Sequence, residues 1–119
     1  MLVVDDDPDV RATFREMLED MGQTVLEAPN GRAALDFLVA DRDVDVSLIL
    51  LDLQMPVMNG WDFLDLLRHY TRLSAIPVVV ISAFASLGKS HPSVVAWLRA
   101  PYPVSQLREL VQVHVQSDV

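Results

Sequence analysis

Acidic side chains directly follow two apolar runs that have the length of buried strands. Asp5 and Asp6 come after the apolar residues 1–4. Asp52 ends a second run, residues 46–51. Carboxylates placed close together repel one another, and at neutral pH they favour a hard cation with oxygen ligands, such as Mg²⁺. Because a carboxylate beside such an ion can attack phosphorus and form an aspartyl-phosphate, these residues predict phosphoryl chemistry on Asp52.

A plainer interpretation applies to each acidic residue taken alone. An Asp after a strand is usually a turn residue or a helix cap, and Asp7, which precedes Pro8, is best explained as a cap. Asp5 and Asp6 alone would also be read as turn residues. Asp52 is harder to explain in this way, because an apolar run precedes it and the sequence Leu-Gln-Met-Pro-Val-Met-Asn-Gly follows it.

Alternating strand and helix signals run along the whole chain. Continuous apolar runs predict strands covered on both faces of a parallel sheet, and apolar residues at helical spacing predict the helices that cover them. Asp7 and Pro8 open the first helix, Gly22 stops it, Asn30 opens the second and Pro103 opens the last. The predicted strands are 1–4, 23–28, 46–51, 77–81 and 94–99, and the helical patterns cover 10–21, 34–39, 61–67 and 104–114.

Polar residues converge at one edge of this predicted sheet. In an open parallel sheet, ligands bind beyond the carboxyl ends of the strands. Asp5 and Asp6 end the first strand, Asp52 ends the third and Ser82 ends the fourth. Helical periodicity is poor over residues 84–93, so the fourth helix expected there is short or missing.

Composition limits the class of protein. A chain of 119 residues suits one domain, residues 1–119, with a single core. There is no cysteine, which excludes thiol chemistry, and the net charge of -8 disfavours direct contact with nucleic acid or anionic membranes. The sequence shows no apolar run of transmembrane length and no signal peptide, so we expect a cytoplasmic protein.

Several motifs resemble the receiver domains of response regulators in two-component signalling. They are VVDDDP at 3–8, LLDLQMPVMNG at 50–60, SA at 82–83, WL at 97–98 and APY at 100–102. The resemblance covers essentially the whole chain. It implies a flavodoxin-like, doubly wound α/β fold with a five-stranded parallel sheet in the order 2-1-3-4-5.

The resemblance also implies a role for each matching site residue. Asp52 corresponds to the phosphoacceptor. Asp5 and Asp6 correspond to the acidic pair that holds Mg²⁺, with Asp6 favoured as the direct ligand. Asp52 itself and the backbone carbonyl of Gln54 complete the protein ligands.

Four further positions match residues of the family's switch. Ser82 corresponds to the hydroxyl residue that binds the phosphoryl group, and Ala83 leaves space for phosphate to enter. Trp97 corresponds to the aromatic residue that changes rotamer on activation. Pro101 corresponds to a proline that usually follows a cis peptide bond.

The chain departs from the family pattern in two places. The family normally has lysine where Ala100 stands, and the segment between Ser82 and Trp97 is several residues short. Lys89 and His91 lie in that segment, and we expect both to be solvated loop residues. The alternative is that Lys89 folds over the acidic site and replaces the missing cation.

Three functions are consistent with these residues. The first is a switch that receives phosphate from a histidine kinase or phosphotransfer protein. The second is a pseudo-receiver, which binds a partner without phosphorylation. The third, a haloacid-dehalogenase-type phosphatase, ranks last because that class needs an Asp where Gln54 stands, so we do not expect an enzyme.

With the fourth helix shortened, we expect a homodimer or output partner to use a face formed by Trp97 and the last helix.

Overall fold

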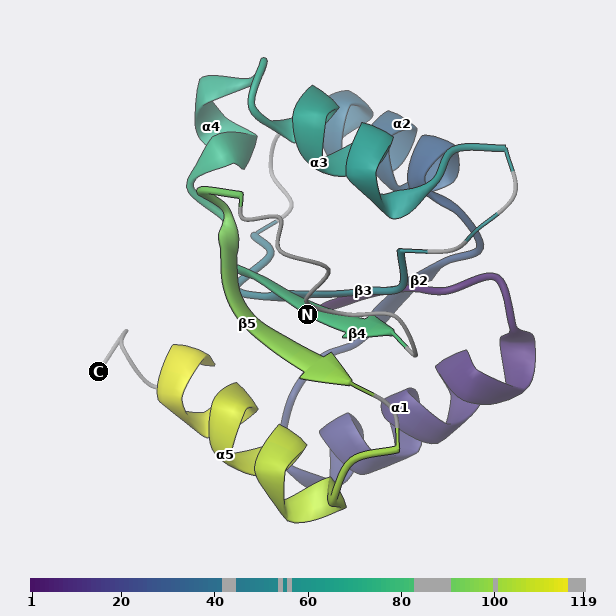
Figure 1. Ribbon diagram of the computed structural model, residues 1–119, viewed down its shortest axis with the longest axis vertical. Coiled ribbons are helices and arrows are strands. Elements are labelled where there is room, and N and C mark those ends of the chain that lie inside the picture. The colour runs from purple at the N-terminus through teal and green to yellow at the C-terminus, as the bar shows by residue number, and fades with distance from the viewer. Residues whose placement is uncertain (42–44, 54, 56, 83–90, 100, 116–119) are drawn as a thin grey trace.

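A five-stranded parallel sheet forms the centre of the molecule, in the order β2-β1-β3-β4-β5 (Figure 1). This order confirms the predicted fold class. The computed structural model describes residues 1–41, 45–53, 55, 57–82, 91–99 and 101–115. The elements are β1 (Leu2–Val4), α1 (Pro8–Asp20), β2 (Leu26–Ala28), α2 (Gly31–Ala40), β3 (Ile49–Leu51), α3 (Gly60–Leu67), α4 (Thr71–Ser74), β4 (Val78–Ser82), β5 (Val94–Arg99) and α5 (Val104–Val115).

Helices cover both faces of the sheet. Helices α1 and α5 lie on one face, and α2, α3 and α4 lie on the other (Figure 1). Strand residues alternate between the two layers: Val3 and Leu50 pack with α1 and α5, whereas Val4 and Leu51 pack with α2 and α3. This alternation follows from the two-residue period of a strand, and burial of both faces explains why the strands are almost wholly apolar.

The helix ends follow the capping signals of the sequence. The Asp7 side chain accepts a hydrogen bond from the Asp9 amide and caps α1, whose first residue is Pro8. The chain leaves α1 through Gly22, which has φ +85°. The Asn30 side chain caps α2 by accepting from the Ala33 amide. Within the described part of the chain, no helix is long and apolar enough to cross a membrane.

Three elements differ from the sequence prediction. Strand β2 is shorter than the predicted 23–28, because its partner β1 offers only Leu2, Val3 and Val4 for pairing. Strand β3 begins at Ile49 rather than residue 46, although the residues before it remain largely buried. The four-residue helix α4 was not predicted, because a single turn is too short to show periodicity.

His91 corrects one expectation about the shortened segment. Its side chain is only 6% exposed, so it is not a solvated loop residue. The imidazole Nδ1 accepts a hydrogen bond from the Ser93 amide, and Nε2 lies 3.8 Å from Asp65 Oδ1 on α3. Residues 83–90, where the fourth helix was expected to be short or missing, lie outside the described residues, as does Lys89.

Protonation of His91 should destabilise the fold. Burial is the main cause that lowers the pKa of His91 below 6.5; Arg68 lowers it further and Asp65 opposes the shift. An imidazolium also cannot accept the bond from the Ser93 amide. Below about pH 6.5 the unfolded state then binds more protons, so the free energy of unfolding falls as the pH falls.

Urea denaturation at several pH values measures this effect. His91→Gln should remove part of the stability lost between about pH 7.5 and 5.5, the range in which histidine titrates. His69→Gln, which changes an exposed histidine two residues after α3, is the control for the loss of a histidine elsewhere. Identical profiles for the wild type and His91→Gln would show that His91 titrates normally.

Candidate functional site

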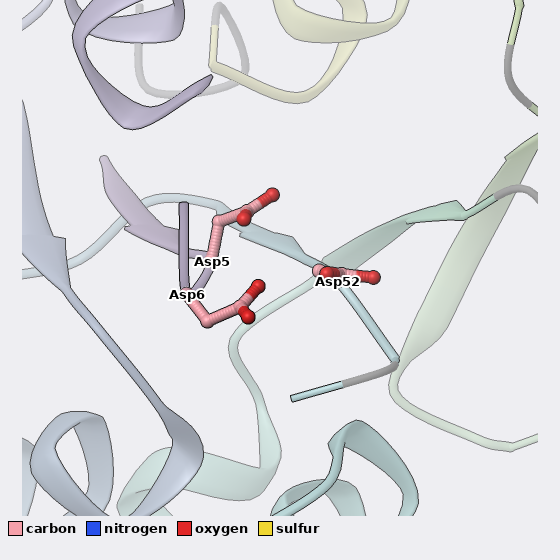
Figure 2. Close-up of side chains that lie close together, drawn as sticks. All are labelled: Asp5, Asp6 and Asp52. Carbon is pink, nitrogen blue, oxygen red and sulfur yellow. The ribbon is translucent and has the colours of Figure 1, made fainter. Parts of the chain in front are cut away.

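The pairing of β1 with β3 brings the acidic residues together. In this parallel pair Val4 lies opposite Leu51, so Asp5 and Asp52 leave the sheet side by side. The Asp52 amide donates to the Val4 carbonyl at 3.0 Å, which fixes the end of β3 against β1. Asp5, Asp6 and Asp52 each offer a carboxylate oxygen, and these atoms lie within 4.8 Å of one another (Figure 2). We call these residues the acidic cluster.

Hydrogen bonds in the turn between β1 and α1 orient the cluster. Asp5 Oδ1 accepts from the Asp7 amide at 2.9 Å, and the Asp5 amide donates to the Ala28 carbonyl of β2 at 3.2 Å. Asp7 is occupied as the helix cap, as predicted. Asp5 is half-buried and fixed, whereas the Asp6 carboxylate is exposed to solvent.

Burial and the neighbouring carboxylates both affect the pKa of Asp5. The pKa of Asp5 is raised from 3.8 to about 6, mainly by burial; the bond from the Asp7 amide lowers it, and the charges of Asp52, Asp6 and Asp7 contribute smaller upward shifts. Folding therefore brings three carboxylates close together. A divalent cation in this position would offset their mutual repulsion.

The donor set fits Mg²⁺. All the side-chain donors are carboxylate oxygens, which are the ligands that this hard ion takes in proteins. Ligands on opposite sides of an Mg²⁺ ion lie about 4.2 Å apart, because each bond is about 2.1 Å. The observed limit of 4.8 Å is therefore slightly wide, and small side-chain movements would bring the oxygens into range.

Close approach of α3 to the cluster depends on Gly60. Its amide donates to the Leu53 carbonyl at 2.8 Å. A Cβ on Gly60 would lie 2.7 Å from the Leu53 Cα and 2.9 Å from the Asp52 carbonyl oxygen, which are distances that side chains do not tolerate. In the loop between them, Val57 has φ 70° and is 81% exposed. This strained backbone conformation, in the loop that follows Asp52, is unusual for a β-branched residue.

The two predicted switch residues lie on neighbouring strands. Ser82 ends β4 and is buried at the same edge of the sheet as the acidic cluster. Trp97 lies on β5, opposite Val80, and packs on the face that carries α3. There its ring centroid is 5.6 Å from that of Trp61, with 39° between the planes.

Trp97 and α5 pack on opposite faces of the sheet, and the partner surface expected from them stays a prediction. Trp97 belongs to the core layer of α2 and α3, whereas α5 packs on the opposite face through Leu107 and Val111. The reason is the alternation of side chains along β5, which sends Trp97 away from α5.

Some predicted site residues lie outside the described residues. They are Gln54, Ala83, Lys89 and Ala100. The peptide bond between Ala100 and Pro101 falls in the same category, so its predicted cis form stays a prediction.

Two residues near the cluster were missed in the sequence. Arg11 Nη1 donates to the Asp5 carbonyl at 2.6 Å. Tyr102 is half-buried, and its pKa is raised first by burial and then by the charge of Asp5. The position of Arg11 four residues after the cap Asp7 was a signal that it would lie over the turn. Tyr102 offered no such signal.

Comparison with known proteins agrees with this architecture. An open parallel sheet with carboxylates at its carboxyl edge defines an α/β protein with a ligand site at the strand ends. The chain matches the model of the response regulator receiver domain over residues 1–95 and belongs to that family.

Three relatives illustrate the similarity. Response regulator Rre1 of Synechocystis is 31% identical over 117 residues, which cover 94% of this chain and 49% of Rre1. The transcriptional regulatory protein CpxR of Escherichia coli is 40% identical over 88 residues, covering 72% of this chain and 34% of CpxR. The structure of chemotaxis protein CheY4 of Vibrio cholerae superposes with a TM-score of 0.81 at 28% identity, covering 96% of each chain. The chain spans between 10% and 63% of the length of the first curated relatives.

Binding of Mg²⁺ to the acidic cluster should stabilise the protein. A ligand that binds only the folded state adds about 2.7 kcal/mol at about 100 times its dissociation constant. The melting temperature should therefore rise by several degrees when Mg²⁺ is added, as measured by differential scanning calorimetry.

A matched pair of variants locates that effect. Asp6→Asn should lose most of the rise, because it removes an exposed ligand while leaving the bonds of Asp5 intact. Asp36→Asn removes the same charge from a remote, exposed position on α2 and should keep the full rise. Equal rises in both variants would mean that the acidic cluster is only a turn.

Proposed function

We propose that this chain is a phosphorylation-dependent signalling switch whose phosphoacceptor is Asp52. Receiver domains interact with histidine kinases or phosphotransfer proteins. The observation that carries the proposal is the convergence of Asp5, Asp6 and Asp52 within 4.8 Å at the ends of parallel strands. Asp5, Asp6, Asp52 and the carbonyl of Gln54 would hold Mg²⁺. The ion would neutralise charge on the transferring phosphoryl group.

The transfer itself needs one nucleophile and one leaving group. An oxygen of the Asp52 carboxylate forms a bond to phosphorus while the bond between phosphorus and the donor histidine breaks. The phosphohistidine ring, protonated on its other nitrogen, leaves with the electron pair of the nitrogen–phosphorus bond and so becomes a neutral imidazole. The half-buried position of Asp52 at the strand end keeps the carboxylate reachable from outside.

Other residues would respond to phosphorylation of Asp52. The Ser82 hydroxyl, at the neighbouring strand end, would donate to a phosphoryl oxygen, and Ala83 would leave room for it. Trp97 would shift as Ser82 moves, because both lie near the carboxyl end of the sheet on adjacent strands. Lys89 is the candidate cation to compensate for Ala100.

The alternative function is that of a pseudo-receiver, which has the receiver fold but does not depend on phosphorylation. In a pseudo-receiver, the domain would bind its partner whether or not Asp52 carries phosphate. The lysine-to-alanine change at Ala100 favours this alternative, and the shortened segment before β5 supports it. The intact acidic cluster favours the phosphorylated switch. We propose a cytoplasmic location and protein partners for either function, because the net charge of -8 opposes contact with nucleic acid.

Phosphorylation should be detectable directly. Incubation with acetyl phosphate and Mg²⁺ should add the mass of one phosphoryl group to the intact protein. Asp52→Asn should abolish the addition, whereas Asp36→Asn should not change it. Omission of Mg²⁺ should also abolish it. A wild type that gains no mass while it still binds Mg²⁺ would favour the pseudo-receiver.

Restoring the lysine should strengthen the conformational response. A hydrogen bond to a charged group contributes about 1.5–3 kcal/mol, and typical allosteric coupling is about 1–3 kcal/mol, so loss of the lysine removes a comparable share. With beryllofluoride as phosphoryl mimic, Trp97 fluorescence should change little in the wild type and more in Ala100→Lys.

The measurement is made in a Trp61→Phe background, because the fluorescence change then comes from Trp97 alone. A full response in the wild type would indicate a substitute cation, and Lys89→Ala should then abolish that response. No response in Ala100→Lys would contradict a role for this position in the switch.

A further inference from the structure

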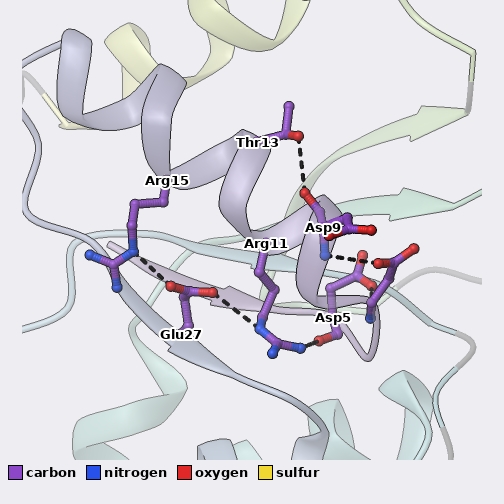
Figure 3. A network of polar contacts seen from close by, with 7 residues as sticks. Asp5, Asp9, Arg11, Thr13, Arg15 and Glu27 are labelled. Carbon is purple, nitrogen blue, oxygen red and sulfur yellow. Dashed lines mark hydrogen bonds and ion pairs between the residues drawn. The ribbon is translucent and has the colours of Figure 1, made fainter.

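A network of charged side chains joins the acidic cluster to the neighbouring strand. Arg11, on the first turns of α1, donates from Nη1 to the Asp5 carbonyl at 2.6 Å. Its Nε donates to Glu27 Oε1 on β2 at 3.1 Å (Figure 3). Glu27 Oε2 accepts a second bond, from Arg15 Nε at 2.6 Å. One guanidinium therefore connects α1, the end of β1 and β2.

Geometry, rather than charge, sets Arg11 apart from Arg15. Both arginines pair with Glu27, so the carboxylate balances much of their charge locally. Arg11 has a second partner, the Asp5 backbone, and its side chain is only 16% exposed. Arg15 is 37% exposed, and its second partner is Glu19, one turn further along α1. Of these second contacts, only the bond from Arg11 to the Asp5 carbonyl reaches the turn that carries the acidic cluster.

The Asp5 carbonyl is a sensitive point of that turn. It belongs to the peptide unit between Asp5 and Asp6, so its direction determines where both carboxylates start. The three carboxylates of the cluster repel one another, and a turn free to relax would move them apart. A rigid donor fork, held by Glu27 on its other side, resists that relaxation.

We infer that Arg11 is a positioning residue of the acidic cluster, holding the Asp5 carbonyl so that the carboxylates of Asp5 and Asp6 stay beside Asp52. The inference rests on the proposed function in one respect, since it takes the cluster to be the Mg²⁺ site. Arg11 acts through the backbone and touches neither the metal nor the phosphoryl group.

The test compares Arg11→Ala with Arg15→Ala. Both variants remove one positive charge and one bond to Glu27, but only the first removes the bond to the Asp5 carbonyl. Arg11→Ala should weaken Mg²⁺ binding about 10-fold or more, which is typical when the outer partner of a metal ligand is lost. Arg15→Ala should change the dissociation constant by less than about 2-fold, because exposed charges contribute little. Titration followed by amide NMR shifts gives each constant.

A second readout needs no metal. Hydrogen exchange of the Asp7 amide, which donates to Asp5 Oδ1, should be faster in Arg11→Ala than in the wild type and unchanged in Arg15→Ala. Arg11→Lys retains a donor for the carbonyl but loses the fork, so its dissociation constant should be intermediate. If Arg11→Ala does not fold, Arg11→Lys takes its place in the comparison with Arg15→Ala.

The outcomes separate this inference from the proposed function. Equal loss of Mg²⁺ affinity in both alanine variants would overturn the inference, as would no loss in Arg11→Ala, or in Arg11→Lys if only that variant folds. A wild type that binds no Mg²⁺ would also overturn it. A wild type that binds Mg²⁺ but accepts no phosphoryl group would contradict the proposed function alone, and the variants would still decide the role of Arg11.

Discussion

Mutual repulsion among the carboxylates at the ends of β1 and β3 is the constraint on which the rest of the site depends. Parallel pairing of two buried strands places Asp5 and Asp52 side by side whatever their charges. The sheet can hold them there because the residues of the central strands β1, β3 and β4 are almost completely buried, and burial of apolar side chains is the dominant favourable contribution to folding. The carboxylates of the site are therefore held close together by the fold itself.

The three acidic residues of the turn between β1 and α1 have different roles. Asp5 is fixed through its amide, its carbonyl and one carboxylate oxygen. Asp7 is occupied at the start of α1, which leaves Asp6 exposed at the outer side of the cluster. A fixed inner carboxylate and an exposed outer one suit an ion that keeps part of its water shell. Gly60 adds a further limit, because its missing Cβ lets α3 begin against the Asp52 backbone.

Sequence reasoning succeeded where one local pattern determines the outcome. Continuous apolar runs identified the buried strands, and the residues directly after them, Asp5, Asp52 and Ser82, followed from strand order alone. The helix caps Asp7 and Asn30 were also predicted correctly, because capping depends only on neighbouring residues. The prediction was wrong where the outcome depends on a distant partner: β2 is limited by the length of β1, and His91 is buried by α3. The role of Arg11 depends in the same way on Glu27, sixteen positions along the chain.

The pair of Trp61 and Trp97 connects β5 to the start of α3. Trp97 packs on the α3 face, and its ring is 5.6 Å from Trp61 at the start of α3. Protein interiors are close-packed, so a change of the Trp97 rotamer either moves Trp61 or opens a gap beside it. Gly60, the residue before Trp61, is itself held against the backbone of Asp52 and Leu53. Gly60 therefore lies against Asp52 and the next residue, Trp61, lies against Trp97, so the start of α3 connects the two parts of the proposed switch on the sheet face opposite α5.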